Sequence, residues 1–426
     1  YLYILVMELP KLKLELMFFH SRLHDYMVLE ESRRSLLESL GKRFSVTVIS
    51  YKNITAERLA DPEKVYIPFI ASGGCEEIFQ SYGFSLPLPL FFLHDDQSNS
   101  LPATLELFTY VTQGRMSIPL IFSEDEISEE LLSRTLRMQQ TFRKLKNTSI
   151  ALFGDASPWL LSSKVDTNAI SRMLKVSFQN IEIPFICKQY KHLTALSREN
   201  KELYNNILKK STCLKNCTKE DLSDAIRMYQ AMDELMVYYS CNALTVKCFD
   251  LIKSCHVTAC MAISLFNQAG IPAACEGDIP ALLTMIMAGN ISQSPVFMAN
   301  PVGYNREQNT LDIAHCTVPL SMTSSYCLNS HYETGIGVAV EGTLEKDVPY
   351  TAVKWIGNTL ERFFVSEGVA TESKHSDNQC RTQMTLRLDR PVSDFILNAM
   401  ANHILVVKGR HADVLNIWNG FLAYLR

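Results

Sequence analysis

The chain has 426 residues, of which 47% are apolar and 20% are charged, and its formal net charge at pH 7 is −4. Such a composition is typical of a globular protein with a large core, and the length predicts two or three domains. The negative charge argues against nucleic acid or an anionic membrane surface as the main partner, because both would repel it. No apolar run reaches the roughly 18 residues that a membrane-spanning helix needs.

Short apolar runs alternate with longer amphipathic stretches in residues 1–147. This alternation is typical of an α/β domain with a parallel sheet. We predict strands at 11–19, 44–50, 64–70 and 88–93, a helix at 30–40 and a long charged helix at 127–146.

The same alternation restarts in residues 148–300 and predicts a second α/β domain. Asp278 resembles a helix N-cap, because Pro280 follows it in the first turn. The predicted strands are 149–153, 175–178, 243–249, 271–275 and 295–299, and the predicted helical regions are 193–239, 259–269 and 281–288.

The pattern changes in residues 301–426, where the apolar runs are spaced like the strands of an antiparallel sheet or barrel. They fall at 309–318, 335–341, 351–356, 383–388 and 404–407, and a helix at 412–424 follows. The predicted fold is therefore two Rossmann-like α/β domains with parallel sheets, followed by a mostly antiparallel β domain.

The twelve cysteines show no spacing typical of a small disulfide-rich domain, so we expect them to be reduced and the protein to be cytoplasmic. Cys213 and Cys217 form the only close pair, and without a matching second pair they do not predict a zinc site. The apolar start, residues 1–9, lacks a basic segment and a cleavage site, so it is not predicted to be a signal peptide.

Two polar residues follow predicted strands of the second domain. Glu276 comes directly after the strand 271–275, and Asn300 comes directly after the strand 295–299. Ligands of α/β sheets bind at the carboxyl ends of the strands, and neighbouring strands would bring both residues within about 10 Å. Glu276 is therefore a candidate functional acid, whereas Asn300 could equally be a turn residue.

Further candidates lie in the third domain. His315 shares one face of its strand with Leu311 and Ile313, and Asp312 points to the other face. His315 could be a ligand or a buried, hydrogen-bonded core residue. Asn402 and His403 precede the strand 404–407. Carboxylate and imidazole groups around an open position suit Mn²⁺ or Mg²⁺ better than a structural zinc.

The order of these features resembles the L-fucose isomerase family, and more distantly its L-arabinose isomerase relatives, over residues 243–415. The motifs that carry the resemblance are Lys247-Cys248, Cys275-Glu276-Gly277-Asp278, Phe297-Met298-Ala299-Asn300, Ala314-His315-Cys316 and Asn402-His403, the last followed by an apolar strand and Gly409-Arg410-His411. The resemblance implies a fucose isomerase-like fold and a metal-dependent aldose–ketose isomerase that acts on a pentose or 6-deoxyhexose through an ene-diolate.

The resemblance also implies roles for individual residues. Glu276 would bind the metal and act as acid or base, His403 would be a second ligand, and Asn402 would contact the sugar. The arabinose isomerase relatives imply a ligand role for His315. Family members are homo-oligomers, which implies a trimer or hexamer here. We further assign Lys247 and Arg381 to substrate binding.

One position departs from the family pattern, because Asn300 stands where a second metal-binding carboxylate is expected. An amide offers an oxygen to a metal but cannot exchange a proton. Asp312 is our candidate for the missing acid or base, with Glu333, Asp278 or a metal-bound water as alternatives. The departure also leaves open an enzyme that acts on a modified or acidic sugar, recognised by Arg381 or Arg410, and a non-catalytic protein that binds a sugar or metal.

Overall fold

The computed structural model describes residues 11–82, 85–113, 120–123 and 129–426. The predicted start at 1–9 and the first two residues of the predicted helix 127–146 lie outside these ranges. The described chain forms two compact units. The first comprises the residues up to Leu145 together with Ile417–Leu425, and the second comprises Lys146–Asn416 and Arg426. The predicted three-domain division stays a prediction.

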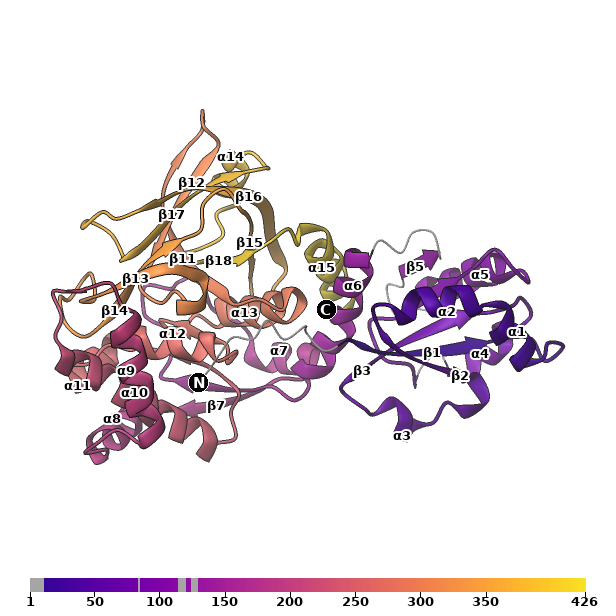
Figure 1. Cartoon of the computed structure of the whole chain (residues 1–426), viewed down its shortest axis with the longest axis horizontal. Coiled ribbons are helices and arrows are strands. Elements are labelled where there is room, and N and C mark those ends of the chain that lie inside the picture. Colours follow the sequence, from indigo (N-terminus) through magenta and orange to yellow (C-terminus); the bar gives the residue numbers. More distant parts are fainter. Residues whose placement is uncertain (1–10, 83–84, 114–119, 124–128) are drawn as a thin grey trace. The chain divides into compact units, whose positions relative to one another are not determined.

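The first unit is built on a five-stranded parallel sheet with the order β2-β1-β3-β4-β5 (Figure 1). Its central strands are nearly continuous apolar runs, as expected for strands covered on both faces. The strands are β1 (Lys13–Phe19), β2 (Ser45–Ser50), β3 (Lys64–Ile70), β4 (Phe91–His94) and β5 (Leu120–Ser123). The helices are α1 (Tyr26–Ser32), α2 (Arg34–Gly41), α3 (Ala56–Leu59), α4 (Glu76–Tyr82), α5 (Ser100–Gln113) and α6 (Glu129–Leu145). The predicted single helix 30–40 is wrong, because Arg33 leaves the helical conformation between α1 and α2.

The second unit begins with another parallel sheet, of order β10-β9-β6-β7. Its strands are β6 (Ser149–Phe153), β7 (Ser177–Ile181), β9 (Ala243–Val246) and β10 (Ala273–Cys275). Its helices are α7 (Thr167–Leu174), α8 (Ile183–His192), α9 (Arg198–Lys210), α10 (Lys219–Tyr238), α11 (Cys248–Cys255), α12 (Cys260–Gln268) and α13 (Ile279–Ser292). The predicted strand 243–249 is too long, because α11 begins at Cys248.

The same unit contains a closed, six-stranded antiparallel barrel of order β11-β12-β17-β16-β15-β18. Its strands are β11 (Val296–Asn305), β12 (Thr310–His315), β15 (Pro349–Ile356), β16 (Arg362–Lys374), β17 (Thr382–Leu388) and β18 (Ile404–Lys408). A small sheet, β14-β13-β8, comprises β8 (Leu214–Lys215), β13 (Thr323–Asn329) and β14 (Ala339–Leu344), and the last helices are α14 (Val392–Asn398) and α15 (Ala412–Leu425). The predicted fold class is therefore confirmed.

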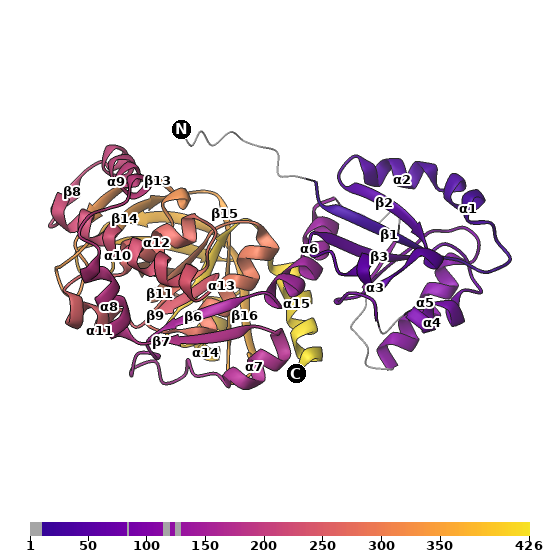
Figure 2. The ribbon, with the colours of Figure 1, turned by 90° about the horizontal axis from the view of Figure 1, so that it is seen from below.

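Helix α13 joins the second parallel sheet to the barrel. It contacts β9 and β10 of the sheet and β15 and β18 of the barrel (Figures 1 and 2). Ten of its residues, including Leu282 and Met285, are buried, so the helix is apolar on all sides. The residues just before α13 therefore lie between the second parallel sheet and the barrel.

The position of Asn300 differs from the prediction. β11 does not end at Ala299 but continues to Asn305, and it belongs to the barrel rather than to the parallel sheet that contains β10. β11 pairs with β18 over Val296–Ala299 and with β12 from Asn300 onward. The predicted adjacency of two parallel strands is therefore wrong, because the chain switches to antiparallel pairing at this strand.

Four cysteines form two disulfides, Cys187–Cys255 and Cys213–Cys327. The prediction that all cysteines are reduced is therefore wrong for these four. Sequence spacing gave no signal for either bond, because the partners are 68 and 114 residues apart. In the described part of the chain, no helix is both long and apolar enough to cross a membrane.

Candidate functional site

The turn between β10 and α13 holds Glu276 in an unusual conformation. Glu276 has φ +61° and Gly277 has φ +73°. A Cβ at Gly277 would lie 2.6 Å from Ala156 Cα, and Ser157 N donates to the carbonyl of Glu276 at 2.8 Å. A left-handed conformation is costly for a side chain such as glutamate, by about 1 kcal/mol or more, and such strain persists where the surroundings impose it. This observed strain points to a functional role for the turn.

The Glu276 carboxylate faces a partly open region. Oε2 accepts a hydrogen bond from Trp159 Nε1 at 2.7 Å, and no described cation lies within 4.0 Å of the group. Trp159 is 50% exposed. Its ring packs edge-on against Phe249, with centroids 5.0 Å apart.

Asp278 lies two residues further on and is fully buried. It caps α13 by accepting from Ala281 N at 2.8 Å, which confirms the predicted N-cap. Its Oδ2 also lies 2.8 Å from His403 Nδ1 and 3.3 Å from Lys354 Nζ. Burial by itself would raise the pKa of Asp278, but Lys354 and His403 outweigh it and hold that pKa well below its usual range. An ionised Asp278 makes Nδ1 of His403 the donor and leaves Nε2 with a free lone pair.

Asn300 and His403 lie on neighbouring strands beside this turn. Ala299 of β11 pairs with Ile404 of β18, so Asn300 and His403 continue the same antiparallel ladder. Asn300 shares a strand face with Met298, whose sulfur accepts from Cys275 N at 3.4 Å. The barrel face that carries Asn300 therefore packs against the strand end that carries Glu276.

His315 joins the same group. Its ring centroid lies 5.8 Å from that of His403, and its Nδ1 lies 2.8 Å from Thr317 Oγ1. Burial and, to a smaller extent, the neighbouring His403 lower the pKa of His315 to about 3. His315 is therefore neutral at physiological pH, which is the form that a ligand or a hydrogen-bonding histidine needs.

Two buried atoms of this group have no hydrogen-bond partner among the described residues, namely Asn300 Oδ1 and His403 Nε2. Both are atom types that can act as ligands of a divalent cation through a lone pair. However, within the described ranges no three His, Cys, Asp or Glu side chains are arranged so that they could hold a metal ion. Glu276, His315 and His403 do not make up such a cluster as they lie. The metal-ligand roles of these three residues and of Asn300, with Mn²⁺ or Mg²⁺ as the ion, stay a prediction.

Three other predicted site residues form ion pairs of their own or are exposed. The ammonium of Lys247 pairs with Asp250 at 2.9 Å. The Asp312 carboxylate lies 2.9 Å from Lys374 Nζ, on a partly exposed part of β12. Asn402 is adjacent to His403 in the chain but its side chain is exposed.

Arg381 does lie near the group. It immediately precedes β17. The first residue of β17, Thr382, pairs with His315 on the neighbouring strand β12. Its guanidinium is buried and donates from Nε to the carbonyl of Ser330 at 2.8 Å.

Sequence reasoning missed Lys354, which is fully buried against Asp278. A signal was present, because Lys354 is the single charge in the apolar strand Pro349–Ile356. A charge in a buried strand requires a partner of opposite sign. This sequence signal could not have identified Asp278 as the partner, because Asp278 lies on another element.

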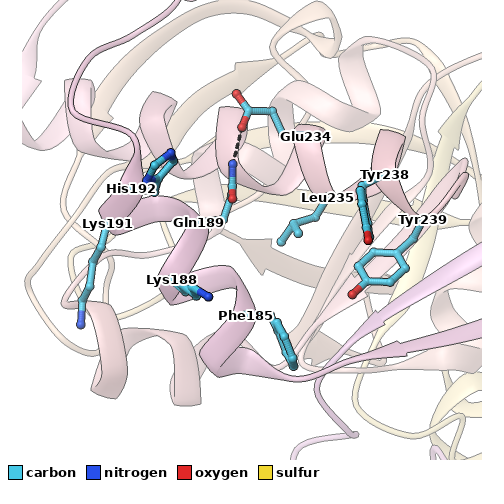
Figure 3. A pocket seen from close by; sticks show the side chains of 9 residues that line it. All are labelled: Phe185, Lys188, Gln189, Lys191, His192, Glu234, Leu235, Tyr238 and Tyr239. Atoms are coloured by element: carbon cyan, nitrogen blue, oxygen red, sulfur yellow. Dashed lines mark hydrogen bonds between the residues drawn. The ribbon is translucent and has the colours of Figure 1, made fainter.

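A separate surface pocket of about 690 Å³ lies between α8 and α10 (Figure 3). Gln189 and Glu234 are hydrogen-bonded in it at 2.5 Å. The lining residues are Phe185, Lys188, Gln189, Lys191, His192, Glu234, Leu235, Tyr238 and Tyr239. None of these residues belongs to the group around Glu276.

The fold and this group define an α/β protein whose polar residues gather where a parallel sheet meets an antiparallel barrel. No known protein-family profile matches the chain. Two curated proteins are similar to part of it. The sulfoquinovose isomerase of Clostridium sp. (strain MSTE9) is 21% identical over 218 residues, which are 51% of this chain and 47% of that protein. The sulfoquinovose isomerase of Alkalicoccus urumqiensis is 22% identical over 190 residues, which are 44% of this chain and 42% of that protein. The chain spans about half the length of these relatives.

Proposed function

We propose that the protein is an aldose–ketose isomerase in which Glu276 is the acid–base group. The observation that carries the proposal is the strained turn that holds Glu276 two residues from Asp278, the buried partner of His403, whose Nε2 has no hydrogen-bond partner among the described residues. The names of both relatives support the isomerase class. They also favour an acidic, sulfonated sugar over the pentose or 6-deoxyhexose implied by the L-fucose isomerase resemblance.

The proposed reaction moves one proton between neighbouring carbons. Glu276 removes the proton from C2 of the aldose, and the electron pair forms a C1–C2 double bond while the C1 oxygen takes up a proton. The protonated Glu276 then returns a proton to C1, and the C2 hydroxyl loses its proton to become the ketone. A positioned proton-transfer group contributes about 10²- to 10⁴-fold to such a rate.

His403 and Asn300 are proposed to serve the sugar oxygens. The free Nε2 of His403 can accept a hydroxyl proton, because Asp278 holds Nδ1 in its protonated form. Asn300 can orient a hydroxyl group through its amide. A divalent cation, when bound, would supply Lewis-acid stabilisation of the ene-diolate, and the free atoms of His403 and Asn300 are the donors that could hold it.

The proposal is tested by hydrogen exchange. The protein is incubated in D₂O with a panel of neutral and anionic aldoses, with Mn²⁺ or with EDTA, and deuterium at C1 or C2 is followed by NMR. Exchange with at least one sugar is expected. Exchange only with Mn²⁺ would support the predicted metal. A folded protein that exchanges no sugar under any of these conditions would contradict the isomerase proposal.

Trp159 is expected to report ligand binding. The chain has three tryptophans, and Trp355 and Trp418 are fully buried whereas Trp159 is half exposed beside Glu276. Binding of a sugar substrate should therefore change mainly the emission of Trp159. Titration with the sugar that shows exchange should alter the fluorescence of the wild type, and Trp159→Phe should remove that change. A signal that persists in Trp159→Phe would place the ligand elsewhere.

The second candidate function is a non-catalytic sugar-binding protein, which the amide at Asn300 favours. Saturable quenching of Trp159 without deuterium exchange would support it. The cytoplasmic location and a closed homo-oligomer, a trimer or hexamer, stay part of the proposal and are tested by fractionation and by the mass in solution.

A further inference from the structure

Arg381 is a buried cation without an acidic partner. Its side chain is 8% exposed, and no described carboxylate lies within 4.0 Å of it. Its described hydrogen bonds are from Nε to Ser330 O at 2.8 Å and from Nη2 to Ser330 Oγ at 3.4 Å. The guanidinium carbon lies 5.7 Å from the centroid of Tyr332. Buried arginines are normally paired with an anion, so this site lacks a negative group.

The other cations considered for substrate binding are already neutralised. Lys247 pairs with Asp250 at 2.9 Å. Arg410 is half exposed and pairs with Glu367 at 2.6 Å and with Asp389 at 2.7 Å. Of the two arginines that the sequence suggested for an acidic sugar, the structure favours Arg381.

A row of side chains leads from Arg381 toward Glu276. His331 follows Ser330, the residue that Arg381 contacts, and its ring centroid lies 5.8 Å from that of Phe249. Phe249 packs on Trp159, which donates to Glu276. Aromatic rings beside polar groups are the surfaces on which sugars pack.

Strand pairing also brings Arg381 toward this group. Thr382, the next residue, pairs with His315 of β12, and the ring centroid of His315 lies 5.8 Å from that of His403.

We propose that Arg381 is the specificity-determining residue that binds the sulfonate group of a sulfonated aldose while Glu276 acts at its C1 and C2 carbons. The inference rests on the proposed function and names its substrate class. Nη1 makes no hydrogen bond to a described residue, so Nη1 and Nη2 can share two sulfonate oxygens. The single positive charge of Arg381 matches a monoanionic sulfonate better than a dianionic phosphate.

The test compares three sugars in four proteins. The sugars are glucose, sulfoquinovose, which is a glucose with a sulfonate at C6, and glucose 6-phosphate as the alternative anion. The proteins are the wild type, Arg381→Gln, Arg381→Lys and the matched surface control Arg306→Gln, since Arg306 is exposed in the hairpin between β11 and β12. Binding is measured by calorimetry and turnover by deuterium exchange.

Arg381→Gln is expected to weaken binding and kcat/KM for sulfoquinovose by about 10- to 100-fold, the effect of losing hydrogen bonds to a charged group. Any exchange of glucose should fall much less than that of sulfoquinovose, because glucose lacks the sulfonate. Arg381→Lys should recover part of the loss, and Arg306→Gln should behave like the wild type. Equal losses for glucose and sulfoquinovose, no loss at all, or a preference for glucose 6-phosphate would overturn the proposal.

Failure of the proposed function would give a different result. A wild type that binds sulfoquinovose but exchanges no sugar, with binding lost in Arg381→Gln, would contradict the isomerase and support the sulfonate site. A wild type that does not bind sulfoquinovose would overturn the sulfonate site. If Arg381→Gln does not fold, as judged by circular dichroism, the comparison rests on Arg381→Lys, which keeps the charge but loses the second donor.

Discussion

Glu276→Gln is expected to lower the rate of deuterium exchange and of isomerisation by about 10²- to 10⁴-fold, because an amide cannot take the proton from the sugar. Glutamine keeps the size of the side chain and an oxygen that can accept from Trp159 Nε1. Substrate affinity, measured by Trp159 fluorescence, should therefore change much less than the rate. A large loss of affinity with an unchanged rate would assign Glu276 to binding rather than to proton transfer.

Glu307→Gln is the matched control for this experiment. Glu307 is exposed in the hairpin between β11 and β12, so the same chemical change there should leave activity and stability unaltered. Comparable activity of Glu276→Gln and Glu307→Gln would contradict the proposed role of Glu276 and would direct attention to His403.

Asp278→Asn is expected to reduce the free energy of unfolding by about 3–5 kcal/mol, the usual cost of removing one partner of a buried ion pair. Lys354 would lose its carboxylate partner in a site where its side chain is 0% exposed. The amide could still cap α13 through its oxygen. The loss in the free energy of unfolding would therefore come from the missing charge and not from a missing helix cap. Denaturant unfolding followed by circular dichroism measures the effect.

The double variant Asp278→Asn with Lys354→Met separates the two contributions. Removing both charges leaves no unpaired ammonium, so the double variant should be more stable than Asp278→Asn alone. Strictly additive losses would show that the contact between Asp278 and Lys354 has no part in stability. The activity of the double variant should remain low, since His403 would lack the carboxylate that fixes its Nδ1 proton.

Local sequence patterns were sufficient for much of the fold. The strands at Lys64–Ile70 and Ser149–Phe153 occur as predicted, because each is a compact apolar run between polar turns. The cap at Asp278 was also visible from Pro280 in the first turn. β13 and β16 were missed, because both carry many polar residues and lack a clean alternation.

The candidate site could be predicted only in part, because its contacts are non-local. The sequence pointed to Glu276 and His403 separately, and it could not show that Asp278 links them through Nδ1 of His403. Asn300 was expected on a parallel strand beside β10, yet it lies on a barrel strand whose partners, β12 and β18, come later in the chain. Pairing over such separations depends on the whole fold and leaves no local pattern.

The closure of the barrel by β18 has a consequence for the synthesis of the protein. β18 pairs with both β11 and β15, and His403 lies immediately before it. Until this late segment has been translated, the facing edges of β11 and β15 have no partner, and unpaired edges are templates for aggregation. Pairings this distant in sequence also form slowly. A nascent chain that stops before His403 would therefore lack its last barrel strand and expose two open strand edges, and it would be prone to aggregate.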